Sequence, residues 1–125
     1  MTIYLSSAML FELVDEVIPG SLWRDKGLVE SAAVRPMAEY GGIEVYPTIH
    51  EKAAALTLSL VTNHPLIDGN KRLGFMGLAV FLRINGYRLI ANDESAYSFI
   101  IKIAMGELRE IDEAAKWIKQ NIEES

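Results

Sequence analysis

The sequence lacks cysteine and has only two histidines, and these absences exclude several kinds of site. Without cysteine the chain cannot form disulfides, a thiolate nucleophile or a cysteine-ligated zinc site. His50 and His64 are too few for a multi-histidine metal centre. No apolar run is long and uncharged enough to span a bilayer, and no signal peptide is recognisable. We therefore expect a cytoplasmic protein that does not contact membranes.

The chain also has fewer basic than acidic residues. The chain has 12 Lys and Arg against 17 Asp and Glu, for a net charge of -5. A field of that sign does not attract nucleic acid, so we expect no direct nucleic-acid binding. Any phosphate ligand must then be held by local cations and backbone N–H groups. With 125 residues and 50% hydrophobic composition, residues 1–125 are expected to form a single domain.

Apolar residues recur at helical spacing along most of the chain, which predicts an all-α fold of about six helices. Ser6 or Ser7 is a candidate cap for the first helix, and Asn92 or Asp93 for the fifth. Thr48 and Glu51 fit a capping box, with Glu51 reaching back. The predicted helices cover residues 8–18, 28–34, 49–62, 70–84, 93–105 and 112–122.

Two of the predicted segments stand out. The helix at 70–84 is apolar nearly all round, which predicts a buried central helix. The paired glycines Gly41 and Gly42 precede an alternation of apolar Ile43 and Val45, which is too short for a sheet. This segment is predicted to form a short β-like flap.

Residues 64–72, with the sequence HPLIDGNKR, form the most informative segment and lie directly before the predicted central helix. A helix start offers free N–H groups and the positive end of the helix dipole, so Gly69 and Asn70 predict a phosphate cradle. Taken alone, Asp68, Gly69 and Asn70 are better explained by a turn with an N-cap. Lys71 and Arg72 in the first turn oppose the dipole, which a bound polyphosphate would explain. The alternative is that Arg72 pairs with Asp68.

Asp68 and His64 add two further chemical roles to this segment. Asp68 is a hard oxygen ligand, and Mg²⁺ bound to a nucleotide commonly needs only one or two protein carboxylates. His64 could, as a neutral imidazole, take a proton from a hydroxyl that attacks phosphorus. Each residue alone has a structural explanation, but together with the cradle they fill separate roles in phosphate chemistry. No such combination of a carboxylate and a phosphate cradle lies beside His50 in the sequence. This histidine is expected to be a surface residue of its capping turn.

The segment resembles the motif of the Fic/Doc family, and it is similar in particular to the Doc (death on curing) branch. That branch carries a pattern like His-x-Phe-x-Asp-Ala/Gly-Asn-Lys-Arg, which His64, Asp68 and residues 69–72 fill. Leu66 stands where phenylalanine is usual and is expected to anchor the loop to the core in its place. The segments YGG at 40–42, EKAAA at 51–55 and FLRINGY at 81–87 also look like Doc relatives.

The resemblance implies a compact Fic-like helical domain and a role for each motif residue. By analogy, His64 would be the catalytic base, Asp68 would hold Mg²⁺, and Gly69, Asn70, Lys71 and Arg72 would bind the phosphates of ATP. Doc proteins are toxins of toxin–antitoxin pairs that transfer the γ-phosphate of ATP to elongation factor Tu and arrest translation. The flap would dock the target in extended form. No self-inhibitory Ser/Thr-x-x-x-Glu-Gly/Asn segment is present, so restraint by an antitoxin in trans is expected.

Two alternatives stay open. The Fic branch transfers AMP and has a glycine and a second arginine where this chain has Lys71 and Phe75. These departures favour phosphate transfer, although Pro65 and Gly69 look Fic-like. The other alternative is a non-catalytic module that binds a nucleotide or phosphate at the helix start. Such a module needs neither His64 nor Asp68 beside the cradle.

Overall fold

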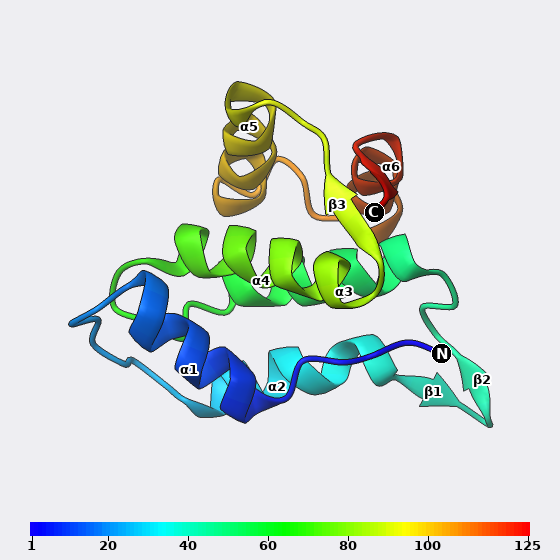
Figure 1. The fold of residues 1–125 in the computed structure, drawn as a ribbon. Helices are drawn as coiled ribbons and strands as arrows, with labels where there is room; N and C mark the ends of the chain where they lie inside the picture. Colours follow the sequence, from blue (N-terminus) through cyan, green and yellow to red (C-terminus); the bar gives the residue numbers. More distant parts are fainter.

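A computed structural model describes residues 1–125 and confirms the predicted all-α fold. Its helices are α1 (Ser7–Val17), α2 (Gly27–Val34), α3 (Ile49–Thr62), α4 (Asn70–Ile84), α5 (Asp93–Ala104) and α6 (Ile111–Gln120), with a 3-10 turn at Arg35–Met37. α3 and α4 lie side by side in the middle, with α1 and α2 on one side of them and α5 and α6 on the other (Figure 1). None of these helices is long and apolar enough to cross a bilayer.

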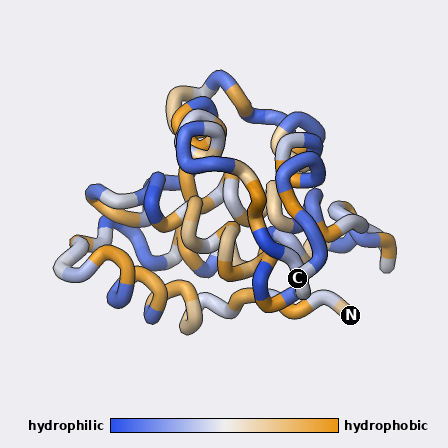
Figure 2. Tube along the Cα trace, turned by 45° about the horizontal axis from the view of Figure 1, so that its top comes forward, coloured by the Kyte–Doolittle hydropathy of each residue, from blue (hydrophilic) through white to orange (hydrophobic).

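The most enclosed helix is α3 rather than α4. Ten consecutive residues of α3, Lys52–Val61, are buried, because α4, α6 and α2 all pack against it. α4 buries one face only, made by Leu73, Gly74, Gly77, Leu78, Phe81 and Leu82. The predicted central position of residues 70–84 is found, since α4 lies beside α3 between the two outer pairs of helices, but α3 is the more enclosed of the two. Hydrophilic and hydrophobic segments alternate along the outer helices in Figure 2, as one-sided burial requires.

Two glycines let α4 approach α3 closely. A Cβ atom built on Gly74 would lie 2.3 Å from Val61 Cγ2, and one on Gly77 would lie 2.7 Å from Leu60 Cδ1. Real side chains cannot occupy such distances, so glycine at these positions sets the separation of the two helices. The close packing fixes the start of α4 beside the end of α3, where the segment 64–72 connects them.

The helix starts follow the predicted caps. Ser6 and Asn92 cap α1 and α5 through their side-chain oxygens. Thr48 Oγ1 accepts from the backbone N–H of Glu51 at 3.2 Å and donates to Glu51 Oε1 at 2.7 Å. The carboxylate of Glu51 therefore reaches back to the hydroxyl of Thr48 rather than to a backbone N–H. A cap of this kind typically stabilises a helix by about 1 kcal/mol.

The predicted flap is an antiparallel hairpin of β1 (Glu39–Tyr40) and β2 (Ile43–Glu44). Gly41 and Gly42 form its turn with φ of 59° and 82°, which glycine adopts without steric cost. The buried ammonium of Lys52 in α3 bonds Glu44 at 3.0 Å and also the carbonyl of Tyr46. The base of the hairpin is thus tied to α3, while its tip is exposed.

A second strand pair closes the end of the chain. β3 (Tyr87–Leu89) pairs antiparallel with β4 (Ile122–Glu124), with Leu89 opposite Ile122. The sequence patterns do not predict this pairing. The expectation that the last helix continues to Ile122 is wrong, because α6 ends at Gln120 and the chain turns there to join β3.

Candidate active site

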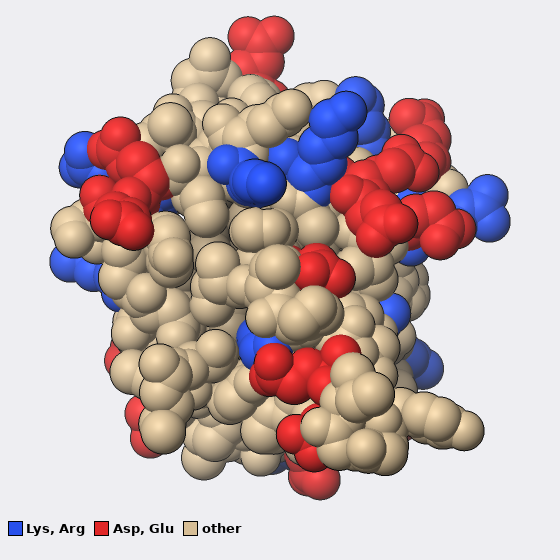
Figure 3. Space-filling model, turned by 90° about the vertical axis from the view of Figure 1, so that its right-hand side faces the viewer, with Lys and Arg blue, Asp and Glu red and all other residues tan.

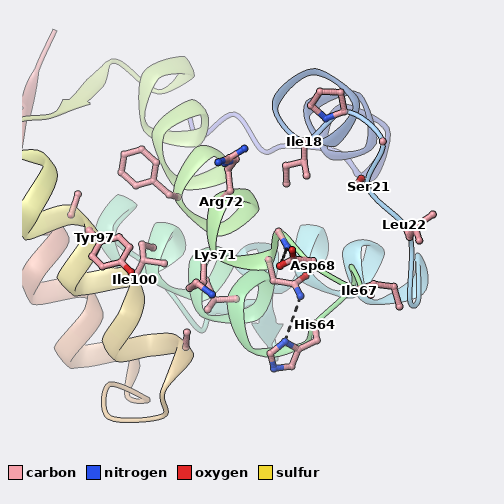
Figure 4. A pocket seen from close by; sticks show the side chains of 18 of the residues that line it. Ile18, Ser21, Leu22, His64, Ile67, Asp68, Lys71, Arg72, Tyr97 and Ile100 are labelled. Atoms are coloured by element: carbon pink, nitrogen blue, oxygen red, sulfur yellow. Dashed lines mark hydrogen bonds between the residues drawn. The ribbon is translucent and has the colours of Figure 1, made fainter.

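An open cleft of about 1000 Å³ lies at the start of α4. One side is lined by the α1–α2 loop, the centre by the segment 64–72, and the opposite side by α5. In Figure 4, Leu22 and Ile67 lie at one rim, and Tyr97 and Ile100 lie across from them. His64, Asp68, Gly69, Asn70, Lys71 and Arg72 all line this cleft, so the structure brings every predicted site residue together.

The amino end of α4 has the features of the predicted phosphate cradle. Gly69 is the N-cap with φ of 101° and provides no side-chain cap. The backbone N–H groups of Asn70, Lys71 and Arg72 have no acceptor in the protein. These groups and the positive end of the helix dipole lie at the wall of the cleft. An anion of suitable size could accept from them.

The charged side chains of the motif are not paired with one another. The ion pairs of the molecule are Lys52–Glu44 and Arg88–Glu123, so the alternative of an Arg72–Asp68 pair is not found. Arg72 reaches only the carbonyl of Val17, at 3.5 Å. Both Lys71 and Arg72 are exposed at the cleft and available to an anionic ligand.

Asp68 is exposed and retains an oxygen for a ligand. Its Oδ1 accepts from the N–H of Gly69 at 2.9 Å, and its Oδ2 has no protein donor. No group of three or more His, Asp or Glu side chains gathers here or elsewhere. The donor set therefore suits a Mg²⁺ ion that brings phosphate and water ligands with it, and not a metal held by protein alone.

Asn70 has a structural task that its sequence position did not reveal. Its side-chain amide accepts from the backbone N–H of Leu66 and donates to the carbonyl of the same residue, each at 2.9 Å. Leu66 itself is 1% exposed and anchors the loop to the core, as expected of the residue in the usual phenylalanine position. The side chain of Asn70 therefore braces the loop, and its backbone N–H is what it can offer to an anion.

His64 is exposed at the cleft in a strained conformation. Its φ of 53° makes it the one non-glycine residue with positive φ, and it precedes Pro65. Both features disfavour this geometry, and left-handed non-glycine residues typically cost about 1–3 kcal/mol. The ring Nδ1 lies 3.5 Å from Asn70 Nδ2, a contact too long to fix the tautomer (Figure 4). No protein group therefore fixes the imidazole by a short hydrogen bond.

His50 lies outside the cleft, at the start of α3, and is partly exposed. Burial lowers the pKa of His50, and the positive charge of Lys119 lowers it further, while Glu51 opposes both. The folded chain therefore binds this proton more weakly than the unfolded chain. His50 has no place in the chemistry of the cleft.

Two further groups at the site were not predicted. Arg24, in the α1–α2 loop, hydrogen-bonds the carbonyls of Asn63 and His64. Tyr97 and Ile100 on α5 form an apolar wall with Phe75 of α4. These residues are far from the motif in sequence, and no local pattern links them to it. Only a resemblance covering the whole chain could have pointed to them.

Comparison with known proteins agrees with this geometry. The family model described as Fic/DOC family matches residues 4–82, which include α1 through most of α4 and the whole segment 64–72. A protein named Toxin Doc from Mycolicibacterium smegmatis is 48% identical over 69 residues, covering 55% of this chain and 53% of that protein. The match thus spans about half the length of this relative. Because the family model covers more than half of the chain, the chain belongs to the Fic/DOC family.

Proposed function

We propose that the protein is a Doc-type toxin that transfers a phosphate from ATP to a hydroxyl of a translation factor, elongation factor Tu, and so arrests translation. The observation that carries this proposal is the open cleft at the start of α4. There an exposed imidazole, a carboxylate with a free oxygen, two unpaired cations and free N–H groups converge. The similarity to a protein named Toxin Doc supports the toxin part of the proposal.

The residues of the cleft divide the work of phosphoryl transfer. The target hydroxyl oxygen bonds to the γ-phosphorus, the bond from that phosphorus to the β–γ bridging oxygen breaks, and ADP leaves. His64 accepts the hydroxyl proton. Lys71, Arg72 and the free N–H groups of α4 hold the phosphates and offset the negative charge. Asp68 would hold Mg²⁺, which neutralises phosphate charge when bound.

AMP transfer is the second candidate. In the Fic branch, a glycine and a second arginine at the motif favour a nucleotide placed with its α-phosphate at the reacting position. In this chain Lys71 is exposed in the cleft and Phe75 presents a half-buried ring to its wall. A lysine side chain crowds the space that glycine leaves, and a phenylalanine cannot bind phosphate. The two residues favour the γ-phosphate as the group transferred.

The apolar wall of the cleft offers a surface for the adenine ring. Tyr97 is 67% exposed at this wall, next to Ile100 (Figure 4). Base–aromatic stacking is typically worth about 1–3 kcal/mol. We expect Tyr97→Ala to raise KM for ATP about fivefold or more with kcat little changed, and Tyr97→Phe to behave like the parent. Steady-state kinetics check this, and an unchanged KM in Tyr97→Ala would place the base elsewhere.

Restraint by an antitoxin in trans is the expected mode of regulation, with a helix of that partner laid across the site. We expect a cognate antitoxin encoded beside this protein to stop transfer at stoichiometric concentration and to compete with ATP. A transfer assay with increasing partner measures this. Transfer at the full rate under saturating partner would contradict the expectation.

Nucleic-acid partners are not part of this proposal. On the face shown in Figure 3, which carries the β1–β2 hairpin, acidic side chains form several clusters and basic ones make no continuous surface. This face therefore offers no continuous basic surface to the phosphate backbone of DNA or RNA.

One experiment separates the candidate functions. The protein is incubated with purified elongation factor Tu, and in parallel with translation extract, using ATP labelled at the γ- or at the α-phosphate. We expect label to reach the elongation factor from the γ position only. Label from the α position would show AMP transfer. Label from neither position, in either mixture, would favour the non-catalytic binding module.

A further inference from the structure

Arg24 donates hydrogen bonds to three successive carbonyls at the motif loop. Its Nη2 reaches the carbonyl of Asn63 at 2.7 Å, its Nε reaches that of His64 at 2.6 Å, and its backbone N reaches that of Pro65 at 2.8 Å. Arg24 is about 40 residues away from the loop in sequence. These bonds fix the orientation of the peptide groups on both sides of His64.

The guanidinium suits this position for two reasons. Its planar fork presents donors at fixed angles, so that one side chain can serve two adjacent carbonyls at once. Asn63 is also the C-cap of α3, and a cation is stabilised near the negative end of a helix dipole. An ammonium group lacks the fork and would serve these carbonyls less well.

The loop keeps its place without this side chain, because backbone contacts also attach it to the α1–α2 loop. The N–H of Ile67 donates to the carbonyl of Leu22 at 2.9 Å, and Trp23 forms an antiparallel bridge with Leu66. The N–H of Asp25 adds a bond of 3.0 Å to the carbonyl of Pro65. The guanidinium itself therefore acts mainly on Asn63 and His64, where no backbone contact replaces it.

We propose that Arg24 is a positioning residue that holds His64 in its left-handed conformation, so that the imidazole faces the cleft. His64 adopts a φ of 53° that histidine before proline disfavours, so a nearby restraint must maintain it. Arg24 supplies that restraint from outside, since it is not one of the residues that line the cleft. The catalytic consequence rests on the proposed function, in which His64 is the base.

The kinetic test uses Arg24→Ala, Arg24→Lys and a matched control, Arg109→Ala. Arg109 is likewise exposed and donates from Nε to a backbone carbonyl, that of Gly106, at 2.6 Å, but it lies outside the cleft. We expect Arg24→Ala to lower kcat about ten- to a hundredfold, as a misplaced base does, with the Kd for ATP unchanged within about twofold. Arg24→Lys should recover part of the rate, and Arg109→Ala should match the parent.

Adding Arg24→Ala to a His64→Ala background distinguishes positioning from other roles. If Arg24 acts through His64, the double variant should transfer no more slowly than His64→Ala alone. A further loss in the double variant, or a parallel loss of ATP affinity in Arg24→Ala, would overturn the proposal. A parental rate in Arg24→Ala would overturn it as well.

A second measurement needs no substrate and therefore separates this proposal from the proposed function. The two histidine rings are observed by NMR, with His50→Gln assigning them. In Arg24→Ala we expect the His64 ring signals to shift and broaden and amide exchange at Asn63 and His64 to accelerate, while His50 is unchanged. Unaltered His64 signals and exchange would refute the positioning role, whether or not the protein transfers phosphate.

Discussion

His64→Ala is expected to lower phosphate transfer by at least about a hundredfold while the fold survives. A general base typically contributes about 10²–10⁴-fold to a rate, and no other titratable imidazole lines the cleft. The side chain is exposed and makes only one long contact, so its removal should cost little packing. Transfer of labelled phosphate and the free energy of unfolding in urea measure the two effects separately.

The second histidine provides the matched control for this prediction. His50→Gln should transfer phosphate at the parental rate, because His50 lies outside the cleft. His64→Gly should be inactive and more stable than His64→Ala by up to about 1 kcal/mol, since glycine adopts positive φ without strain. A parental rate in His64→Ala would show that another group takes the proton.

Gly74→Ala is expected to destabilise the protein, although alanine normally stabilises a helix. In an exposed helix the change from glycine to alanine gains about 0.5–1 kcal/mol. Here the new Cβ would lie 2.3 Å from Cγ2 of Val61, whose β-branched side chain is stiff. Overpacking of this kind typically costs about 1–3 kcal/mol. Urea denaturation of the variant and the parent gives the difference.

Gly77 offers a graded comparison in the same helix. A Cβ there would lie 2.7 Å from Cδ1 of Leu60, the far end of a flexible side chain that can move aside. Gly77→Ala should therefore cost less than Gly74→Ala. If Gly74→Ala instead matches or exceeds the parent in stability, the two glycines do not set the separation of α3 and α4.

The helices could be predicted from the sequence because their signals are local. Side-chain caps at Ser6, Thr48 and Asn92 mark the starts of α1, α3 and α5. The relative burial of two apolar helices is not a local property. α4 is apolar on most sides, yet α3 is the helix enclosed by neighbours, and the pairing that takes Ile122 out of the last helix depends on β3, more than thirty residues earlier.

The candidate site could be predicted only in part for the same reason. His64, Asp68 and residues 69–72 lie on one continuous segment, so their chemistry and spacing are visible in the sequence, and the structure brings them together in one cleft. The residues that hold this segment in place and complete the cleft lie elsewhere in the chain. Arg24 and Tyr97 reach the site only through the packing of α1, α2 and α5 against the centre of the fold.

The most direct test is an NMR titration of the protein with ATP in the presence of Mg²⁺, because the account depends on a triphosphate site at the start of α4. We expect the largest amide shifts at Asn70, Lys71 and Arg72, whose N–H groups have no acceptor in the protein. Removing Mg²⁺ or replacing Asp68 with alanine should weaken this binding. Shifts confined to other surfaces, or no saturable shifts at these three amides, would contradict the account.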